Sequence, residues 1–111
     1  MDINNEYVDV QDALKRIGGN LDLYKRLLNQ FSTGNHIDPI EEALNTRAFE
    51  DASHLIHTLK GVAANLSLAK LAENARNLEA DVKGNLDYTN ALTELKTTYS
   101  MTSQEISKML Q

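Results

Sequence analysis

Apolar residues recur every three or four positions along almost the whole chain, and this spacing limits the fold more than any other feature of the sequence. Such a period places apolar side chains on one face of an α-helix, whereas a half-buried strand would alternate apolar and polar residues. The segment 20–31 is typical, with apolar side chains at Leu21, Tyr24, Leu27, Leu28 and Phe31. Because no segment alternates in the manner of a strand, the sequence predicts an all-α fold.

Capping and helix-breaking residues divide the chain into six helical segments. Asp, Asn and Ser side chains accept hydrogen bonds at helix starts, Pro suits the first turn, and Gly ends helices. The expected segments run from Asp9 to Ile17, from Asn20 to Phe31, from Asp38 to Leu44, from about residue 48 to 65, from Ser67 to Val82 and from Asp87 to Leu110, each named Asp, Asn or Ser being the cap. Short connections make consecutive helices antiparallel neighbours. We therefore expect an antiparallel up-and-down four-helix bundle with a short extra N-terminal helix, as one domain over residues 1–111.

Composition and charge exclude several classes of protein. The chain has no cysteine, which rules out disulfide scaffolds, thiolate zinc sites and cysteine nucleophiles. Its 11 Lys and Arg against 16 Asp and Glu give a net charge of −5, which argues against binding to nucleic acid, where phosphate neutralisation dominates. The acidic, polar start at residues 1–10 does not resemble a signal peptide, and no apolar run is long enough to span a membrane. We therefore expect a cytoplasmic protein with no membrane contact of its own.

The helix expected over residues 48–65 carries an unusual polar flank opposite its apolar stripe. His57, Lys60, Gly61 and Ala64 fall on this flank, and Ser53 lies one turn before His57. A glycine inside a helix costs roughly 1 kcal/mol relative to alanine, so Gly61 needs a reason. Either it marks tight helix packing, or a partner approaches the backbone closely there.

These residue types suit the transfer of a phosphoryl group. A neutral imidazole nitrogen is a nucleophile near pH 7. An ammonium group one turn along the helix can stabilise the charge of the phosphoryl group. A missing side chain at Gly61 would let a bulky donor approach His57 in line. The flank therefore suits a phosphoryl group that is accepted and passed on.

The run from His57 to Ser67, HTLKGVAANLS, resembles the signature of histidine-containing phosphotransfer (HPt) domains. The segment Ile17-Gly18-Gly19-Asn20 is also similar to the entry of such domains in hybrid sensor kinases, and the similarity covers about residues 8–110. The resemblance implies a phosphorelay phosphocarrier of two-component signal transduction. It would accept a phosphoryl group from an aspartate of one receiver domain and pass it to another.

The resemblance also implies roles for individual residues. His57 would carry the phosphoryl group on its solvent-facing ring nitrogen, Lys60 would neutralise it, and Gly61 would admit the partner. Family members often place a Glu or Gln on the following helix, hydrogen-bonded to the other ring nitrogen, and Glu79 is the match. Such a carboxylate would fix the tautomer of the ring. An ordinary ion pair of Glu79 along its own helix, with Arg76 or Lys83, is the alternative.

The expected docking surface lies around His57 and consists of Gly61, Ala64, Ser53 and His54. Its partners would be response-regulator receiver domains and a sensor histidine kinase. We expect no cofactor in this chain and Mg²⁺ on the receiver domain. Ala64 departs from the Gly, Ser or Asn common in the family, which keeps access but removes a possible hydrogen bond. The domain would be a stand-alone protein or the cytoplasmic C-terminal part of a membrane sensor kinase.

Other functions compete with this hypothesis. The bundle could be an interaction module without chemistry, or the phospho-accepting domain of a chemotaxis-type kinase. The His54 and His57 pair invites a metal site, but no third ligand with suitable spacing accompanies it, so none is predicted. His36 is interpreted as an exposed loop residue. The sequence has neither a Walker phosphate loop nor kinase motifs, so we expect no ATP-dependent kinase activity.

Overall fold

The computed structural model describes residues 5–111, and this part of the chain contains six α-helices and no strand. The all-α prediction is confirmed. The helices are α1 Val10–Arg16, α2 Leu21–Thr33, α3 Asp38–Asn45, α4 Phe49–Asn65, α5 Ala69–Lys83 and α6 Thr89–Leu110. Residues 1–4 belong to the N-terminal stretch considered for a signal peptide and lie outside the described residues. Within residues 5–111, none of the helices has the length and apolarity needed to cross a membrane.

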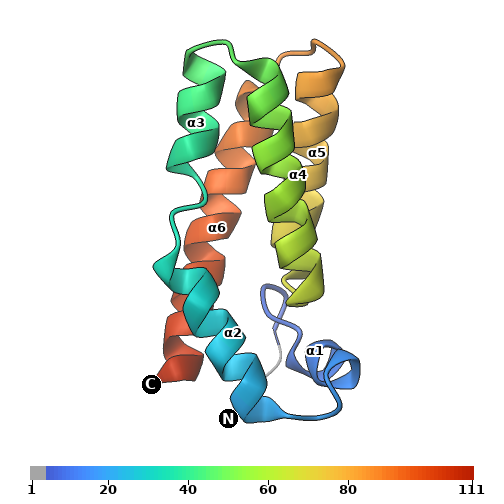
Figure 1. The fold of residues 1–111 in the computed structure, drawn as a ribbon, viewed down its shortest axis with the longest axis vertical. Coiled ribbons are helices and arrows are strands. Elements are labelled where there is room, and N and C mark those ends of the chain that lie inside the picture. The colour runs from blue at the N-terminus through green and yellow to red at the C-terminus, as the bar shows by residue number, and fades with distance from the viewer. Residues whose placement is uncertain (1–4) are drawn as a thin grey trace.

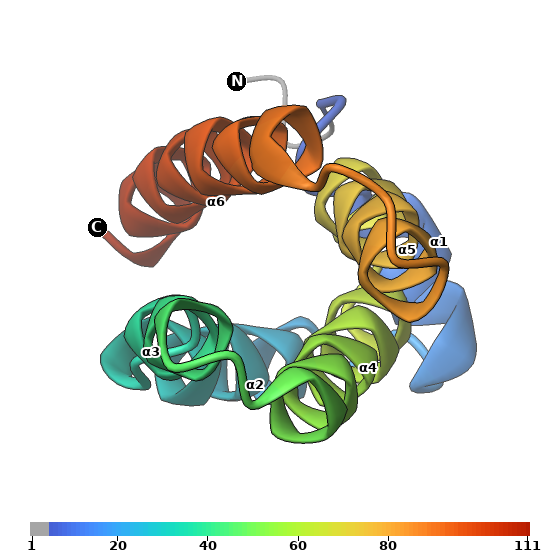
Figure 2. The same ribbon diagram turned by 90° about the horizontal axis from the view of Figure 1, so that it is seen from above.

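Helices α2 to α6 run roughly along the long axis of a molecule that measures 42 × 23 × 20 Å (Figure 1). Helices α2 and α3 follow one another along one side, α4 returns beside them, α5 runs back next to α4, and α6 returns next to α5 (Figure 1). Seen from above, α4 and α6 lie on opposite sides of the molecule (Figure 2). The short helix α1 lies at the lower end, near the start of α5 (Figures 1 and 2).

The core takes buried apolar side chains from every helix, among them Val10, Leu28, Ile40, Ile56, Leu78 and Ile106. Helix α4 contributes a buried stripe that consists of Ala52, Ile56, Leu59 and Ala63. The opposite face of α4 is therefore directed away from the core. Within the described residues, the buried polar side chains are Ser67, Glu79 and Thr102, so a buried glutamate on α5 is an exceptional feature of this fold.

The helix starts confirm some of the predicted caps. The side chains of Asp9 and Asn20 accept hydrogen bonds from the backbone N–H groups of Asp12 (3.1 Å) and Leu23 (3.0 Å). Helix α3 begins with Asp38 inside the helix rather than at the cap, and the last helix begins at Thr89 rather than directly after Asp87. The Asp87 carboxylate nevertheless accepts a hydrogen bond from the first N–H of α6, at 3.0 Å.

The prediction that Ser67 caps α5 is wrong, because a contact distant in sequence engages this residue. Ser67 is buried, has a φ of 57°, and donates its hydroxyl hydrogen to Asp12 Oδ2 at 2.6 Å. The backbone N–H of Asp9 donates to the Ser67 carbonyl at 3.0 Å, and the Tyr24 hydroxyl donates to the Leu66 carbonyl at 2.6 Å. Residues of α1 and α2 and of the α1 cap thus hydrogen-bond to the turn between α4 and α5. These contacts fix α4 and α5 relative to each other.

The interpretation of His36 as simply exposed is also wrong. Its ring is half-buried and stacks on Phe31, with ring centroids 4.4 Å apart. Its Nε2 lies 2.9 Å from the Phe31 carbonyl oxygen, and the ring of Tyr99 lies 6.0 Å from the His36 ring and 5.9 Å from the Phe31 ring. The loop after α2 is therefore held by an aromatic cluster that joins it to α6, a contact that helical periodicity does not reveal.

Candidate functional site

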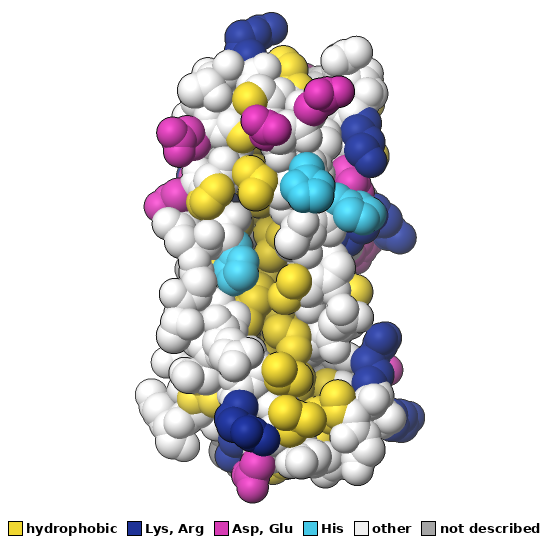
Figure 3. All heavy atoms as spheres, in the orientation of Figure 1, with side chains coloured by type: hydrophobic (Ala, Val, Ile, Leu, Met, Phe, Trp, Pro, Cys, Tyr) yellow, Lys and Arg dark blue, Asp and Glu magenta, His cyan; other side chains and the backbone are white. Residues whose placement is uncertain are grey.

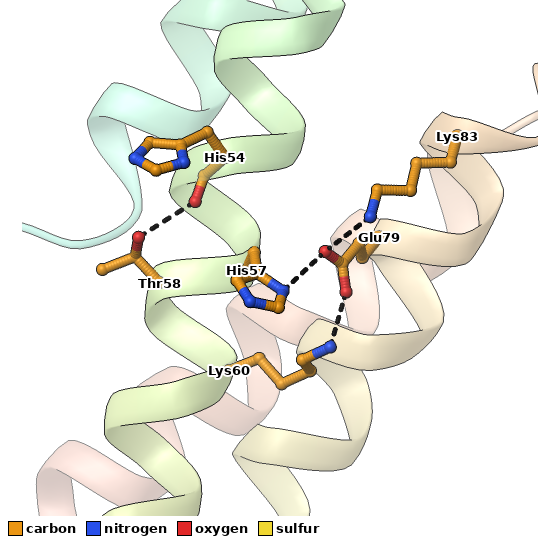
Figure 4. Close-up of polar contacts among 6 residues, drawn as sticks. All are labelled: His54, His57, Thr58, Lys60, Glu79 and Lys83. Atoms are coloured by element: carbon orange, nitrogen blue, oxygen red, sulfur yellow. Dashed lines mark hydrogen bonds and ion pairs between the residues drawn. The ribbon is translucent and has the colours of Figure 1, made fainter.

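His57 lies on the outward face of α4, and its side chain is 64% exposed (Figure 4). Its Nδ1 lies 3.0 Å from Glu79 Oε2, on the neighbouring helix α5. An ionised carboxylate only accepts hydrogen bonds, so Nδ1 must carry the hydrogen of this contact. The neutral ring then keeps its free electron pair on Nε2, which has no hydrogen-bond partner within residues 5–111. The site thus presents one nucleophilic nitrogen to solvent.

Glu79 is the centre of the site. Its side chain is only 7% exposed, and both carboxylate oxygens are occupied. Lys60 donates to Oε1 at 2.7 Å, and Lys83 Nζ lies 3.1 Å from Oε2, the oxygen that also meets His57 (Figure 4). Burial by itself raises the pKa of Glu79, but the hydrogen bonds from Lys60 and Lys83 outweigh it and lower that pKa to about 2. Glu79 is consequently ionised throughout the neutral range.

The lowered pKa of Glu79 predicts how this site contributes to stability at acid pH. The contribution of the ionised group is complete above its ordinary pKa of 4.5 and is lost as the pH falls toward about 2, because the unfolded chain takes up the proton first. We expect the difference in unfolding free energy between the wild type and Glu79→Gln to shrink over this interval. Urea unfolding at a series of pH values measures it. A difference that stays constant from pH 5 to pH 2 would contradict the prediction.

Lys60 lies one turn after His57, but its ammonium group does not point to where a phosphoryl group on His57 would lie. The sequence places it where it would neutralise a phosphoryl group on His57, but in this structure its ammonium group pairs with Glu79. Its side chain is still 30% exposed and lines a groove of about 660 Å³ together with Gly61, Ala64 and Arg76. Lys60 therefore stands between the buried carboxylate and an open groove.

Gly61 is open to solvent. A Cβ atom built at this position would meet no atom within 4 Å, so the glycine is not required for packing against another helix. Ala64, one turn further along α4, is also exposed. Of the two explanations for a glycine inside this helix, tight packing is excluded, and the close approach of a partner remains.

Ser53 and His54 do not join the network around Glu79. Ser53 is half-buried, and His54 is exposed one turn before His57, with its ring directed away from that of His57 (Figure 4). The backbone carbonyl of His54 accepts a hydrogen bond from Thr58 at 3.0 Å. No group of three or more potential metal-ligating side chains occurs among the described residues.

Lys83 belongs to the network, although the sequence singled it out only as a possible ion-pair partner of Glu79. The signal was its position four residues after Glu79, which places both side chains on one face of α5. Arg76, three residues before Glu79, forms no ion pair within the described part of the chain. The structure therefore brings together His57, Lys60, Glu79 and Lys83, with Gly61 beside them.

Comparison with known proteins gives one match. A family model described as Hpt domain matches residues 26–110, a range that contains all four residues of the network around Glu79. No curated protein and no solved structure matches the chain significantly.

Proposed function

Since the chain belongs to the Hpt domain family, we propose that it is a phosphorelay phosphocarrier that accepts a phosphoryl group on His57 from a receiver-domain aspartate and passes it to a second receiver domain. The observation that carries this proposal is the state of the His57 ring. Its Nδ1 is held by a buried, ionised Glu79, while the rest of the side chain is exposed. Nucleophilic catalysis requires such an oriented and accessible nitrogen.

The proposed transfer needs no proton movement within this chain. The electron pair of His57 Nε2 attacks the phosphorus of the aspartyl phosphate, a new N–P bond forms, and the bond between phosphorus and the aspartate oxygen breaks. The bonding electrons leave with the aspartate, which becomes a carboxylate. The ring gains a positive charge, and its Nδ1–H remains hydrogen-bonded to Glu79, which stabilises that charge. Transfer to the second receiver is the same reaction in reverse.

Receiver domains and kinases are the partners of Hpt domains in phosphorelays, so we infer partners of these classes here. The receiver domain would supply Mg²⁺, and this chain would supply the positioned imidazole. These partners would place the reaction in the cytoplasm. We further propose that the molecule is an antiparallel four-helix bundle. In this bundle α2 and α3 follow one another and together take the place of one of the four long helices.

The proposed docking surface follows the exposed side of α4 around Gly61 and Ala64. On one side of it lies the groove that contains Lys60, which charged and small side chains line. On the other side an apolar groove of about 550 Å³ is lined by Ile17, Leu27, Phe31, Val62 and Leu66, among others. A stripe of hydrophobic side chains also runs down the face of the molecule shown in Figure 3. An incoming domain can therefore bury apolar surface beside the end of α4 that follows Gly61, and Ser53 and His54 would meet its edge.

Incubation with a phosphorylated receiver domain tests the proposal. We expect label on this chain that is labile in acid and stable in base, as phosphohistidine is. An interaction module without chemistry would bind the receiver domain without taking up label. The phospho-accepting domain of a chemotaxis-type kinase would be labelled by its ATP-binding partner but not by a receiver domain. Either of these two results would overturn the proposed function.

Removal of the ammonium group next to His57 should slow the transfer without unfolding the protein. We expect Lys60→Ala to reduce the rate of label uptake about tenfold, because a cation that stabilises the incoming phosphoryl charge is lost. Glu79 retains Lys83, so the helical signal in circular dichroism should persist. Lys60→Arg, which keeps a cation, should recover most of the rate. An unchanged rate in Lys60→Ala would remove this residue from the mechanism.

A further inference from the structure

Lys83 contacts the same carboxylate oxygen as His57. Its Nζ lies 3.1 Å from Glu79 Oε2, and His57 Nδ1 lies 3.0 Å from that oxygen, whereas Lys60 occupies Oε1. Lys60 and Lys83 therefore approach one buried glutamate from different sides (Figure 4). The Lys83 side chain is 61% exposed and does not line the groove that contains Lys60 and Gly61.

The division of contacts matters when a phosphoryl group arrives. Lys60 stands at the groove beside Gly61, on the side from which a partner can approach. If Lys60 turns toward a phosphoryl group on His57, Oε1 of Glu79 loses its donor. A buried carboxylate without a cation is costly, and it would take up a proton or shift away. Lys83 remains on Oε2 and prevents this, because it contacts Glu79 without lying in the groove.

The charges of the site lead to the same conclusion. With a neutral His57, Glu79 contributes one negative charge and the two lysines two positive charges. A phosphoryl group on His57 carries a charge of about −2, and the positive charge that the ring gains offsets one unit of it. Without Lys83, Lys60 alone would balance the remaining negative charge of the phosphorylated ring together with the charge of Glu79.

We propose that Lys83 is a positioning residue for phosphotransfer: it holds Glu79, and through it the His57 ring, while Lys60 leaves Glu79 to meet the phosphoryl group. This inference rests on the proposed function. The two lysines have different roles: Lys60 faces the reacting group, and Lys83 acts only through Glu79. Lys83 should therefore favour the phosphorylated state of the chain over the unphosphorylated one.

The test compares Lys83→Met, Lys83→Arg and the control Lys70→Met by the equilibrium partition of label between this chain and a receiver domain at fixed ionic strength. Lys70, near the start of α5, is also an exposed lysine paired with a glutamate, Glu6 at 3.5 Å. We expect Lys83→Met to shift the partition toward the receiver roughly three- to tenfold. The shift is no larger because solvent screens the exposed charge of Lys83. Lys83→Arg should stay within about twofold of the wild type, and Lys70→Met should not differ from it.

A second measurement does not require phosphotransfer. Titration of the Glu79 carboxyl carbon by NMR should show a higher pKa for this group in Lys83→Met than in the wild type, since Lys83 is one of the groups that lower it. A wild type that takes up no label would overturn the proposed function. A wild type that is labelled, with the same partition in Lys83→Met, would overturn the role of Lys83 alone, and so would a Glu79 pKa that does not move.

Discussion

The His57→Gln variant should take up no label from a phosphorylated receiver domain. The glutamine amide nitrogen shares its electron pair with the carbonyl group, so it offers no nucleophile in place of the imidazole Nε2. The expected result is a loss of the acid-labile label to the background of the assay, measured under conditions in which the wild type is fully labelled. This is the largest effect that we predict, because no neighbouring group shares the position of His57.

The same substitution should leave the fold intact, which makes the loss of label interpretable. The His57 side chain is mostly exposed, and Glu79 keeps Lys60 and Lys83 when the ring is removed. We expect the free energy of unfolding in urea to change by no more than about 0.5 kcal/mol. His54→Gln is the matched control on the same helix and should still be labelled, since its ring points away from the site (Figure 4). Equal labelling of His57→Gln and wild type would show that the phosphocarrier proposal is wrong.

The part of the site that lies on one helix could be predicted from the sequence. Positions three, four and seven residues apart share a helix face, so His57, Lys60, Gly61 and Ala64 had to lie together once the segment was recognised as helical. Placement of Glu79 beside His57 needed the family resemblance, because the relative rotation of two helices depends on packing. The buried stripe on α5, which includes Leu71, Leu78 and Val82, agrees with a position at the seam but does not fix a distance.

Contacts between long or distant side chains could not be predicted. Lys60 was expected to neutralise a phosphoryl group on His57, but in this structure the attraction of a buried carboxylate turns it toward Glu79. Helical spacing allows a contact between Glu79 and Lys83 without deciding which carboxylate oxygen is used. Ser67 was misinterpreted for the same reason, since its partner Asp12 lies on an element far away in the sequence. His36 stacks on Phe31, only five residues before it, in a loop contact that helical spacing does not describe.

Replacement of Gly61 should change stability and phosphotransfer in opposite directions. The wild-type glycine leaves open space where its Cβ would stand, so Gly61→Gln should fold normally and gain roughly 0.5 to 1 kcal/mol of stability from helix propensity. The longer side chain would occupy the space through which a receiver domain reaches His57. We therefore expect label uptake to fall at least tenfold, about the cost of a misplaced reacting group, as measured by single-turnover kinetics.

The directions of the changes in stability and in transfer rate distinguish a docking role of Gly61 from a packing role. If Gly61 were needed for helix contacts, any larger residue would lower both stability and transfer, and the two effects would rise together with side-chain size. A docking role predicts instead that Gly61→Ala gains stability and slows transfer only mildly, with Gly61→Gln slowing it most. Ser100→Gln, at an exposed position on α6, adds the same side chain on a helix that lies across the molecule from α4 (Figure 2) and should leave transfer unchanged. Normal transfer by Gly61→Gln would exclude the approach of the partner over this residue, because a bound domain cannot share that space with a glutamine side chain.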